Sequence, residues 1–336
     1  MRKAARTVEG VKTISLSQLD DGRLTRHVSA EAVSSVDAAL DLGRQLATEG
    51  IHPGEGSTAQ LWGALASIAA LDLGAARAIE PHLDALSILH EADIPADPVR
   101  TWGVFASEAP GTTLEAAEGD LGWTITGTKQ WCSLAGTLDS ALVTASGRLW
   151  SVDLHDAGIT VDTAAWRSRG LVEIPSGPVT FDTVAVDPVG DAGWYLERPG
   201  FHWGGIGVAA CWFGGAVGLA RTLYNAPPRG ELAHMHLGAI DEQLEACRAV
   251  LADAAEAVDR REASRVLAKR VRATVARTVD DVLLRVGHAL GPAPLALDGA
   301  HAKRVADLQL YVRQHHAEKD LASLGSTLME SGEAPW

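Results

Sequence analysis

Apolar residues recur at helical spacing through the first ninety residues of the chain. Three such stripes occur between residues 30 and 92, the last of them at residues 83–89. Positions three and four residues apart lie on one face of an α-helix, so each stripe predicts a helix with one buried face. The breaker segment at 52–58 and Pro81 separate the stripes, and we expect the third helix to begin after Pro81.

The pattern changes at residues 92–98, where two prolines stand within four residues. From there to about residue 199 the apolar runs are short, partly alternating, and separated by Gly, Asp and Ser. Alternation with a period of two and frequent turn residues are typical of β-strands. We therefore expect an antiparallel sheet or a small barrel in this part of the chain.

Helical spacing returns at about residue 200. Two long stripes run through residues 240–258 and 271–290, and the GPAP segment at 291–294 follows them. A last helix is predicted from His301 to Leu324.

The order of helices, strands and helices predicts an α+β fold that is mainly α. A chain of 336 residues is longer than one hydrophobic core usually supports. We expect three parts: an N-terminal helical bundle at 1–97, a central antiparallel β domain at 98–199 and a C-terminal helical bundle at 200–336.

One apolar stretch is long enough to cross a membrane. Residues 199–220 contain no Asp, Glu, Lys or Arg, and a membrane span needs about 20 apolar residues. The stretch also contains seven glycines, which allow neighbouring helix backbones to approach closely. We therefore interpret it as a helix buried inside a bundle rather than as a membrane span.

Composition and charge indicate a globular protein with an acidic surface. Hydrophobic residues make up 46% of the chain and the net charge is −14, which argues against nucleic acid or a membrane as the main partner. Residues 200–336 carry a net charge of only −1, so this part is the most suited to an anionic cofactor or thioester. We interpret the basic run at 260–277 as a solvated helix face.

The cysteines and the start of the chain indicate a reducing compartment. The three cysteines are far apart and odd in number, which predicts neither a disulfide framework nor a zinc site. The first ten residues are basic, but the apolar segment of a signal peptide does not follow. We therefore expect a cytoplasmic protein without a bound metal.

Residues 101–146 contain the motif that points to a family. The sequence GTKQWCS stands at 127–133, and a looser element, SEAPGTT, precedes it at 107–113. This segment resembles the β domain of acyl-CoA dehydrogenases, in which a Thr-Glu-Pro strand end and a Gly-Ser-Asp turn lead to a hairpin. That hairpin ends in Gly-x-Lys-x-Trp-Ile/Cys-Ser/Thr. The resemblance is strong over about 45 residues, and the predicted order of helices and strands agrees with the family.

The resemblance implies a bound FAD. In the family, the Trp at the position of Trp131 lies against the isoalloxazine ring, and the hydroxyl at the position of Ser133 hydrogen-bonds flavin N5. The residues at Ala106 and Ser107 line the pyrimidine end of the ring, and the hydroxyl at Thr113 lies near the cofactor diphosphate. A flavin needs an apolar aromatic wall and small polar donors at its ring nitrogens, which these residue types supply.

Three further residues are assigned to the cofactor by the same resemblance. Cys132 stands within the motif beside the flavin. HALGPAP at 288–294 stands where the family has the Gln-x-x-Gly-Gly segment that reaches the FAD of a neighbouring subunit. His288 and Gly291 are therefore expected at that FAD, and the chain is expected to form a homo-oligomer or to pair with a related chain.

The family's catalytic glutamate has no counterpart at its expected position. Counting from the family's arginine at Arg304 places the glutamate position at Arg313, and arginine stays protonated and cannot act as a base. Arg313 continues the apolar face of the last predicted helix, where a charge usually has a partner or a ligand; the alternative is that its side chain extends to the solvated edge of the bundle. His315 and His316 follow, and a histidine with a near-neutral pKa is a candidate base.

Three functions remain open on this basis. The first is an FAD-dependent oxidoreductase similar to acyl-CoA dehydrogenases, which would oxidise an acyl thioester or a similar small molecule. The second is a flavin monooxygenase-like member of the same superfamily, in which histidines assist oxygen chemistry. The third is a non-catalytic subunit that completes the site of a related chain.

Overall fold

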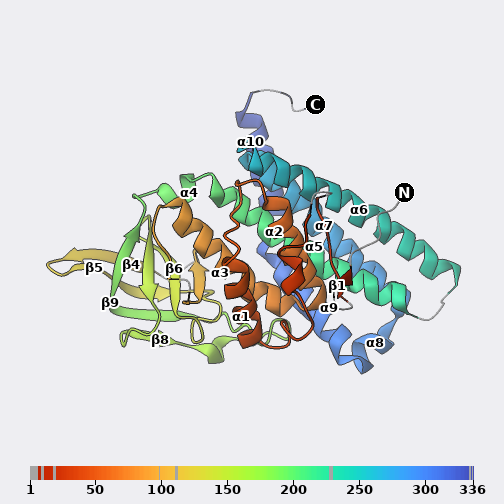
Figure 1. Ribbon diagram of the computed structural model, residues 1–336, viewed down its shortest axis with the longest axis horizontal. Coiled ribbons are helices and arrows are strands. Elements are labelled where there is room, and N and C mark those ends of the chain that lie inside the picture. Colours follow the sequence, from red (N-terminus) through yellow and green to blue (C-terminus); the bar gives the residue numbers. More distant parts are fainter. Residues whose placement is uncertain are drawn as a thin grey trace.

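Figure 1 shows the computed structural model, in which a sheet lies at one end and a larger helical part at the other. The helix α3 runs between the two parts. The structure describes residues 7–8, 11–17, 20–97, 99–109, 113–226, 230–332, 334 and 336.

Three α-helices precede the sheet, as the apolar stripes predict. They are α1 (Val36–Ala47), α2 (Thr58–Leu71) and α3 (Leu73–Glu91), and a 3-10 turn η1 (Thr25–His27) and the short strands β1 (Thr7–Val8) and β2 (Val11–Lys12) come before them. Side chains cap two of these helices. The Ser35 hydroxyl accepts from the Ala38 N–H, and the Asp72 carboxylate accepts from the Ala75 N–H.

The third helix does not begin after Pro81, and that prediction is wrong. Pro81 lies inside α3, where it removes one backbone hydrogen bond. The helix continues because residues on both sides of Pro81 are buried, among them Ile79, Leu83 and Ile88. Packing of α3 against both the sheet and the C-terminal helices therefore offsets the intrinsic cost of an internal proline, about 3 kcal/mol.

The main sheet has seven strands in the described residues, in the order β3-β6-β7-β9-β5-β4 with β8 beside β9. The strands are β3 (Trp102–Phe105), β4 (Leu114–Gly119), β5 (Gly122–Lys129), β6 (Ser140–Ala145), β7 (Arg148–Asp153), β8 (Ile159–Val161) and β9 (Val179–Val189), with a 3-10 turn η2 (Thr163–Ala165) after β8. The sheet is mixed rather than purely antiparallel, because β3 pairs with β6 in parallel. Between β3 and β6 the chain passes through the β4–β5 hairpin, and β6 then runs beside β3 in the same direction.

The C-terminal part consists of long helices around α5. They are α4 (Trp194–Glu197), α5 (Gly200–Asn225), α6 (Glu231–Asp259), α7 (Arg265–Leu290), α8 (Pro292–Leu297), α9 (Gly299–Tyr311), η3 (Val312–Gln314) and α10 (Glu318–Glu330). Helix α5 is long and apolar enough to span a membrane by length and composition alone, and 72% of its apolar window is buried inside the protein. It packs against α2, α3, α7 and α9, as expected for a core helix.

The last predicted helix is interrupted rather than continuous. Helix α9 ends at Tyr311, and α10 begins only at Glu318. Side chains bind the backbone in the gap: the Ala317 N–H donates to His315 Nδ1 at 3.2 Å, and the His316 N–H donates to the Asp320 carboxylate at 3.0 Å. These local bonds compete with helical hydrogen bonds, which explains the break.

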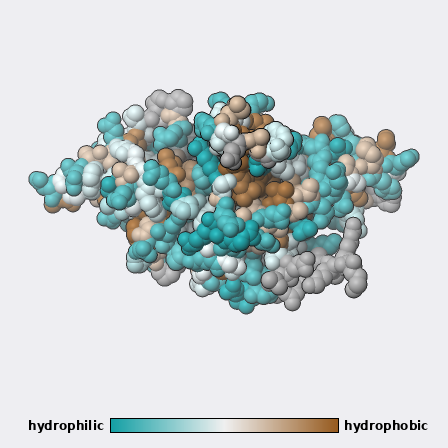
Figure 2. Space-filling model, turned by 90° about the horizontal axis from the view of Figure 1, so that it is seen from above, coloured by the Kyte–Doolittle hydropathy of each residue, from teal (hydrophilic) through white to brown (hydrophobic). Residues whose placement is uncertain are grey.

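One face of the molecule carries apolar surface. Figure 2 shows it from above, with hydrophobic surface near the middle and mostly hydrophilic surface around it. Large apolar side chains are exposed at several places in the described residues, among them Leu196, Leu232, Leu297 and Met329.

Candidate functional site

Ser133 lies where the sheet meets the helices. It follows β5 and Trp131, whose backbone is left-handed with φ of 63° and so turns the chain sharply after the strand. The Ser133 side chain is buried, and its hydroxyl accepts a hydrogen bond from the Arg77 guanidinium at 2.8 Å. The hydroxyl groups of Ser133 and Ser176 are 2.7 Å apart and bond to each other. The hydroxyl is thus held between the sheet and α3.

Lys129 fixes the end of β5. Its ammonium group is buried and donates to the Thr144 carbonyl at 2.9 Å and to the Glu108 carboxylate at 3.3 Å. Trp131, two residues on, is 56% exposed although it is large and aromatic. The hairpin end therefore presents a flat aromatic ring from a rigid base.

Arg77 of α3 contacts both the sheet and the C-terminal helices. It lies on α3, donates to Ser133, and its guanidinium carbon is 5.7 Å from the centre of the Tyr311 ring. Tyr311 is the last residue of α9 and is fully buried. One arginine from the N-terminal helices therefore contacts both the sheet and the C-terminal helices at the same point.

A chain of aromatic and cationic contacts continues from Tyr311. Its ring is 6.3 Å from the Trp212 ring of α5, edge to face, and the Trp212 ring is 6.5 Å from His315. The Arg272 guanidinium of α7 lies over Trp212 at 4.7 Å and donates to the Gly205 carbonyl at 2.5 Å. Cation–π contacts of this kind hold a charge in a mostly apolar interior.

Two carboxyl groups on α3 face the same region. Glu80 is 7% exposed, and Asp84 lies one turn further along the helix. Burial, followed by the nearby Asp84 carboxylate, raises the pKa of Glu80 from its usual 4.5 to about 8. Burial also raises the pKa of Asp84. A carboxyl group with a pKa near neutrality can both give and accept a proton under physiological conditions.

We call these groups the central polar cluster. Its members are Arg77, Glu80, Ser133, Cys211, Arg272 and Tyr311, contributed by α3, the β5 end, α5, α7 and α9. Burial raises the pKa of the Cys211 thiol well above its usual value, so the thiol stays protonated. The Tyr311 hydroxyl lies beside that thiol and has no nitrogen or oxygen partner in the described residues.

A narrow cavity adjoins the cluster on the side of the sheet. It has a volume of only about 10 Å³ and is lined mainly by apolar side chains, including Pro81, Trp102 and Phe105, with Arg77 and Ser133 as the polar groups. The Trp102 indole N–H is buried without a partner in the described residues. A space of this size has room for about one water molecule.

The predicted pyrimidine-side residues lie at the end of the edge strand β3. Ala106 is partly buried, Ser107 is exposed, and both follow Phe105 directly. Thr113 is exposed just before β4. The intervening residues 110–112 of the SEAPGTT element lie outside the described residues. The predicted roles of Ala106, Ser107 and Thr113 stay predictions.

Cys132 and the two residues of the HALGPAP segment lie in different surroundings. Cys132 is buried, and burial raises the pKa of its thiol to about 12, so it can pack beside a ligand but cannot act as a thiolate. His288 is near the end of α7, with its ring 6.0 Å from that of His236. Gly291 ends α7 with φ of 70°, a backbone conformation that glycine adopts without strain. A contact of His288 and Gly291 with a neighbouring subunit's cofactor stays a prediction.

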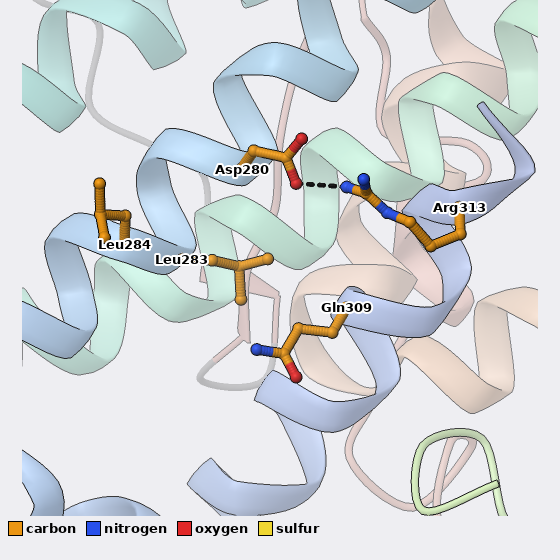
Figure 3. Close-up of a pocket in the computed structure, with 5 residues that line it drawn as sticks. All are labelled: Asp280, Leu283, Leu284, Gln309 and Arg313. Atoms are coloured by element: carbon orange, nitrogen blue, oxygen red, sulfur yellow. Dashed lines mark hydrogen bonds and ion pairs between the residues drawn. The ribbon is translucent and has the colours of Figure 1, made fainter. Parts of the chain in front are cut away.

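Arg313 lies on the outer side of the bundle, where its charge has a partner, as one of the two predictions for it required. Figure 3 shows its guanidinium directed at Asp280 of α7, with Leu283, Leu284 and Gln309 lining the hollow beside them. The Arg313 side chain is 50% exposed and forms an ion pair with Asp280. The position that the count from Arg304 assigns to the family's glutamate therefore directs its side chain toward solvent.

His315 and His316 diverge from each other. His315 is buried against Trp212, and burial lowers the pKa of its imidazole, so the ring is neutral at physiological pH. His316 is exposed and lies 3.5 Å from the Asp320 carboxylate. Of the three predicted catalytic residues, only His315 lies next to the central polar cluster.

The sequence analysis missed most of the central polar cluster. Arg272 belongs to the basic run at 260–277, yet it points inward onto Trp212 rather than into solvent, which corrects the interpretation of that run. The sequence does mark three charged residues of α3, because they recur at helical spacing within an apolar segment: Arg77, Glu80 and Asp84. Tyr311 gave no signal of its own.

The residues around Ser133 fit a flavin better than a metal. No group of three or more His, Cys, Asp or Glu side chains in the described part of the chain is arranged to hold a metal ion. The exposed Trp131 ring offers a flat apolar face, and the Ser133 hydroxyl, the Arg77 guanidinium and the unpartnered Trp102 N–H offer donors. This combination suits a planar heterocycle with polar edges.

Known proteins of similar structure share this arrangement of helices and sheet. No known family profile matches the sequence, and no curated protein matches it either. Solved structures match over nearly the whole chain. A complex of TdsC from Paenibacillus sp. A11-2 with FMN and indole has a TM-score of 0.76 at 17% identity, covering 94% of this chain and 98% of TdsC. The chain has the acyl-CoA dehydrogenase fold.

Two other structures with this fold match equally well. A glutaryl-CoA dehydrogenase from Mycobacterium smegmatis in complex with FADH2 has a TM-score of 0.76 at 14% identity, covering 96% of this chain and 97% of that enzyme. KijD3 in complex with FMN and a dTDP-sugar has a TM-score of 0.76 at 17% identity, with the same coverage. The predicted α+β architecture is therefore confirmed.

Proposed function

We propose that this chain is a flavin-dependent oxidoreductase that acts on a small molecule. The observation that carries the proposal is the central polar cluster at the junction of the sheet and both helical parts, with the exposed Trp131 two residues before Ser133 in the chain. Among structures of similar fold, TdsC contains FMN with indole, KijD3 contains FMN with a dTDP-sugar, and a glutaryl-CoA dehydrogenase contains FADH2. The fold and the donor set support the same proposal.

Trp131, Ser133 and the chain at Ala106–Ser107 would hold the flavin. Trp131 would cover one face of the ring, and the Ser133 hydroxyl would bond to its edge. A bound flavin supplies the electron acceptor for the reaction. The protein excludes water from the site, because Ser133, Tyr311 and Trp212 are all buried. We propose FAD as the flavin, on the resemblance of the GTKQWCS motif.

The two reaction types differ in what the protein must supply. Oxidation of an acyl thioester at Cα–Cβ requires a base for the α-proton, and α9 with η3 directs Arg313 outward instead. Oxygenation requires a neutral hydrogen-bonding group in a dry site, and the buried His315 is such a group. The position of His315 is the observation that favours monooxygenation as the second candidate function.

The decisive experiment is flavin binding by the purified chain. FAD and FMN are titrated separately, with protein fluorescence and visible flavin absorbance as readouts. Trp131→Ala is expected to weaken binding about threefold to tenfold, because an aromatic stacking contact contributes about 0.5–1.5 kcal/mol. Trp336→Ala, at the exposed Trp336, is the matched control and should leave binding unchanged. Failure of the wild type to bind either flavin would refute the proposal.

A second experiment separates the candidate reactions. The flavin-loaded protein is mixed anaerobically with butyryl- to palmitoyl-CoA, and bleaching of the flavin is followed. Bleaching supports thioester dehydrogenation. Absence of bleaching, together with oxygen consumption and oxidation of indole by the chemically reduced protein, supports monooxygenation. A flavin-loaded chain that does neither, but forms a stable complex with a related chain, supports the role of a subunit.

A further inference from the structure

The small cavity between α3 and β3 is lined by hydrogen-bond donors. Three of its lining side chains carry nitrogen or oxygen atoms: Arg77 of α3, Trp102 of β3 and Ser133 after β5. A guanidinium group and an indole N–H can donate hydrogen bonds but cannot accept them. The Ser133 hydroxyl is already bonded to Arg77 and Ser176. The cavity therefore suits a group that accepts hydrogen bonds from Arg77 and Trp102.

Trp102 holds an unused donor at this cavity. Its side chain is 6% exposed, and its indole N–H has no partner in the part of the chain that the structure describes. The residue is fixed from both sides, because its backbone N–H donates to His82 Nδ1 of α3 at 3.3 Å and β3 pairs with β6. A buried donor without an acceptor destabilises a fold, and a bound acceptor would remove this cost.

Arg77 brings a positive charge that no neighbouring carboxylate neutralises. Its guanidinium donates to Ser133 at 2.8 Å and lies over the Tyr311 ring, and it forms no ion pair with any described residue. Glu80 follows one turn later on α3, but burial raises the pKa of its carboxyl group to about 8. That group is therefore mostly protonated at neutral pH. A partly buried cation in such surroundings favours an anion as its partner.

The size of the cavity limits what can enter it. Its volume of about 10 Å³ admits one group the size of a water molecule. A carboxylate oxygen is about that large, whereas a whole organic acid is not. The anion therefore belongs to a molecule that places one oxygen in the cavity and keeps its other atoms outside. Hydrogen bonds from a guanidinium to a carboxylate are stronger than those between neutral groups, so such an oxygen would displace water.

We propose that Arg77 and Trp102 form a carboxylate site, in which the guanidinium and the indole N–H bind one carboxylate oxygen of the molecule on which the enzyme acts. The substrate class is thus a small molecule that carries a carboxylate. The proposed flavin contacts use Trp131 and Ser133 and leave both donors available. The assignment of the carboxylate to a substrate rests on the proposed function, whereas the anion site itself depends only on α3 and β3.

Two other arginines packed against the helices of this region are already engaged. Arg272 donates to two backbone carbonyl groups and lies over the Trp212 ring. Arg198 is buried in an ion pair with Glu91. Among these three arginines, Arg77 is the one with N–H groups left for a ligand.

The test measures formate binding by the flavin-free protein with isothermal titration calorimetry. Formate is the smallest carboxylate, and formamide has nearly the same shape without the charge, so formamide should not bind. Arg77→Gln removes the charge, and Trp102→Phe removes the indole N–H but keeps an aromatic ring. Each variant should weaken formate binding by about tenfold or more, because a hydrogen bond to a charged group is lost. Arg248→Gln is the matched control, because Arg248 lies on the surface of α6 in an ion pair with Glu245.

The indole proton resonance of Trp102 gives a second readout, which a purely structural role would not move. In a spectrum of protein with isotope-labelled tryptophan, the resonance missing from Trp102→Phe belongs to Trp102. Formate should shift it downfield in wild type, because the N–H gains a charged acceptor, and should leave the other indole resonances in place. In Arg77→Gln the same shift should require about tenfold more formate or be lost.

Wild-type protein that neither binds formate nor shifts the Trp102 resonance would overturn the inference. Equal affinities for formate and formamide, or equal formate affinities of wild type and Arg77→Gln, would overturn it too, because charge would then not decide binding. Flavin titration keeps this result apart from the proposed function. A wild type that binds formate but no flavin keeps the anion site and refutes the proposed function, and with it the assignment to a substrate. Flavin binding without formate binding does the reverse.

Discussion

Lys303 of α9 links all three parts of the chain through one ammonium group. Its Nζ lies 3.0 Å from Asp72 at the start of α3, 2.7 Å from Glu173 in the loop before β9, and 2.6 Å from Asp307. Asp307 is buried and also accepts a hydrogen bond from the Leu171 N–H at 2.6 Å. We predict that Lys303→Met destabilises the protein, because it leaves three carboxylates facing one another.

The size of the effect follows from burial. Removing one partner from a fully buried ion pair typically costs about 3–5 kcal/mol. The Lys303 side chain is 39% exposed, so solvent screening reduces the expected loss to about 2–3 kcal/mol. With an unfolding entropy of about 2.1 cal/mol/K per residue, this loss corresponds to a fall in Tm of about 3–4 °C for a chain of this length.

The loss should depend on pH. Hydrogen bonds to Asp307 and Glu173 raise the pKa of Lys303, against the effect of burial, so Lys303 stays charged throughout the range from pH 5 to pH 8. Burial raises the pKa of Asp307 even beside Lys303, and removing Lys303 raises it further. The variant can therefore protonate Asp307 as pH falls, and its deficit should be larger at pH 8 than at pH 5.

Differential scanning calorimetry at the two pH values measures both effects. Lys319→Met is the control, because Lys319 is exposed on α10. A Lys303→Met protein within about 0.5 kcal/mol of wild type at pH 8, the range of ordinary surface substitutions, would show that the network contributes nothing. A deficit independent of pH would show that the carboxylates are not its cause.

Three further predictions concern packing, surface charge and assembly. Gly214→Ala should destabilise the protein by about 2 kcal/mol or more, because the added Cβ would be 2.7 Å from the Ala66 Cα. Gly238 on α6 has open space around it, so Gly238→Ala should stabilise the protein by about 0.5–1 kcal/mol. Urea denaturation compares the stabilities of the two variants. Arg313→Glu should yield no acyl-CoA dehydrogenase activity and should change the free energy of unfolding by less than about 1 kcal/mol, because the exposed side chain lies beside Asp280. Anaerobic bleaching of the flavin by butyryl-CoA measures the dehydrogenase activity. The protein should be a homo-oligomer, and a monomer in light scattering at micromolar concentration would contradict this.

The fold could be predicted because periodicity carries most of its information. The apolar stripes predicted α1, α2, α6 and α7, and the short alternating runs predicted the sheet. The predicted start of the third helix after Pro81 was wrong because the energetic cost of a proline is local. The burial of α3 on two sides, which offsets that cost, depends on elements far away in sequence. The parallel pairing of β3 with β6 could not be predicted, since strand direction depends on the path of the whole chain.

The site was only partly predictable for a related reason. The GTKQWCS motif pointed to Ser133 and Trp131 because its residues are contiguous. Arg77, Glu80 and Tyr311 come together only through the packing of α3 against α9 and α5. The gapless count led to Arg313, whose side chain lies on the outer side of the bundle because α9 ends at Tyr311 and the following turn exposes Arg313 and Gln314.

The packing of α2 against α5 determines when the protein can fold during synthesis. Nearly every residue of α2 is buried, and its main neighbour is completed only at Asn225, roughly 150 residues later. At about 5–20 residues per second, a ribosome takes on the order of 10–30 s to make that interval. During this time the sheet can form first, while the apolar helices α2 and α3 remain without their partner α5. Residues 58–71 therefore remain without their main packing partner until α5 has emerged.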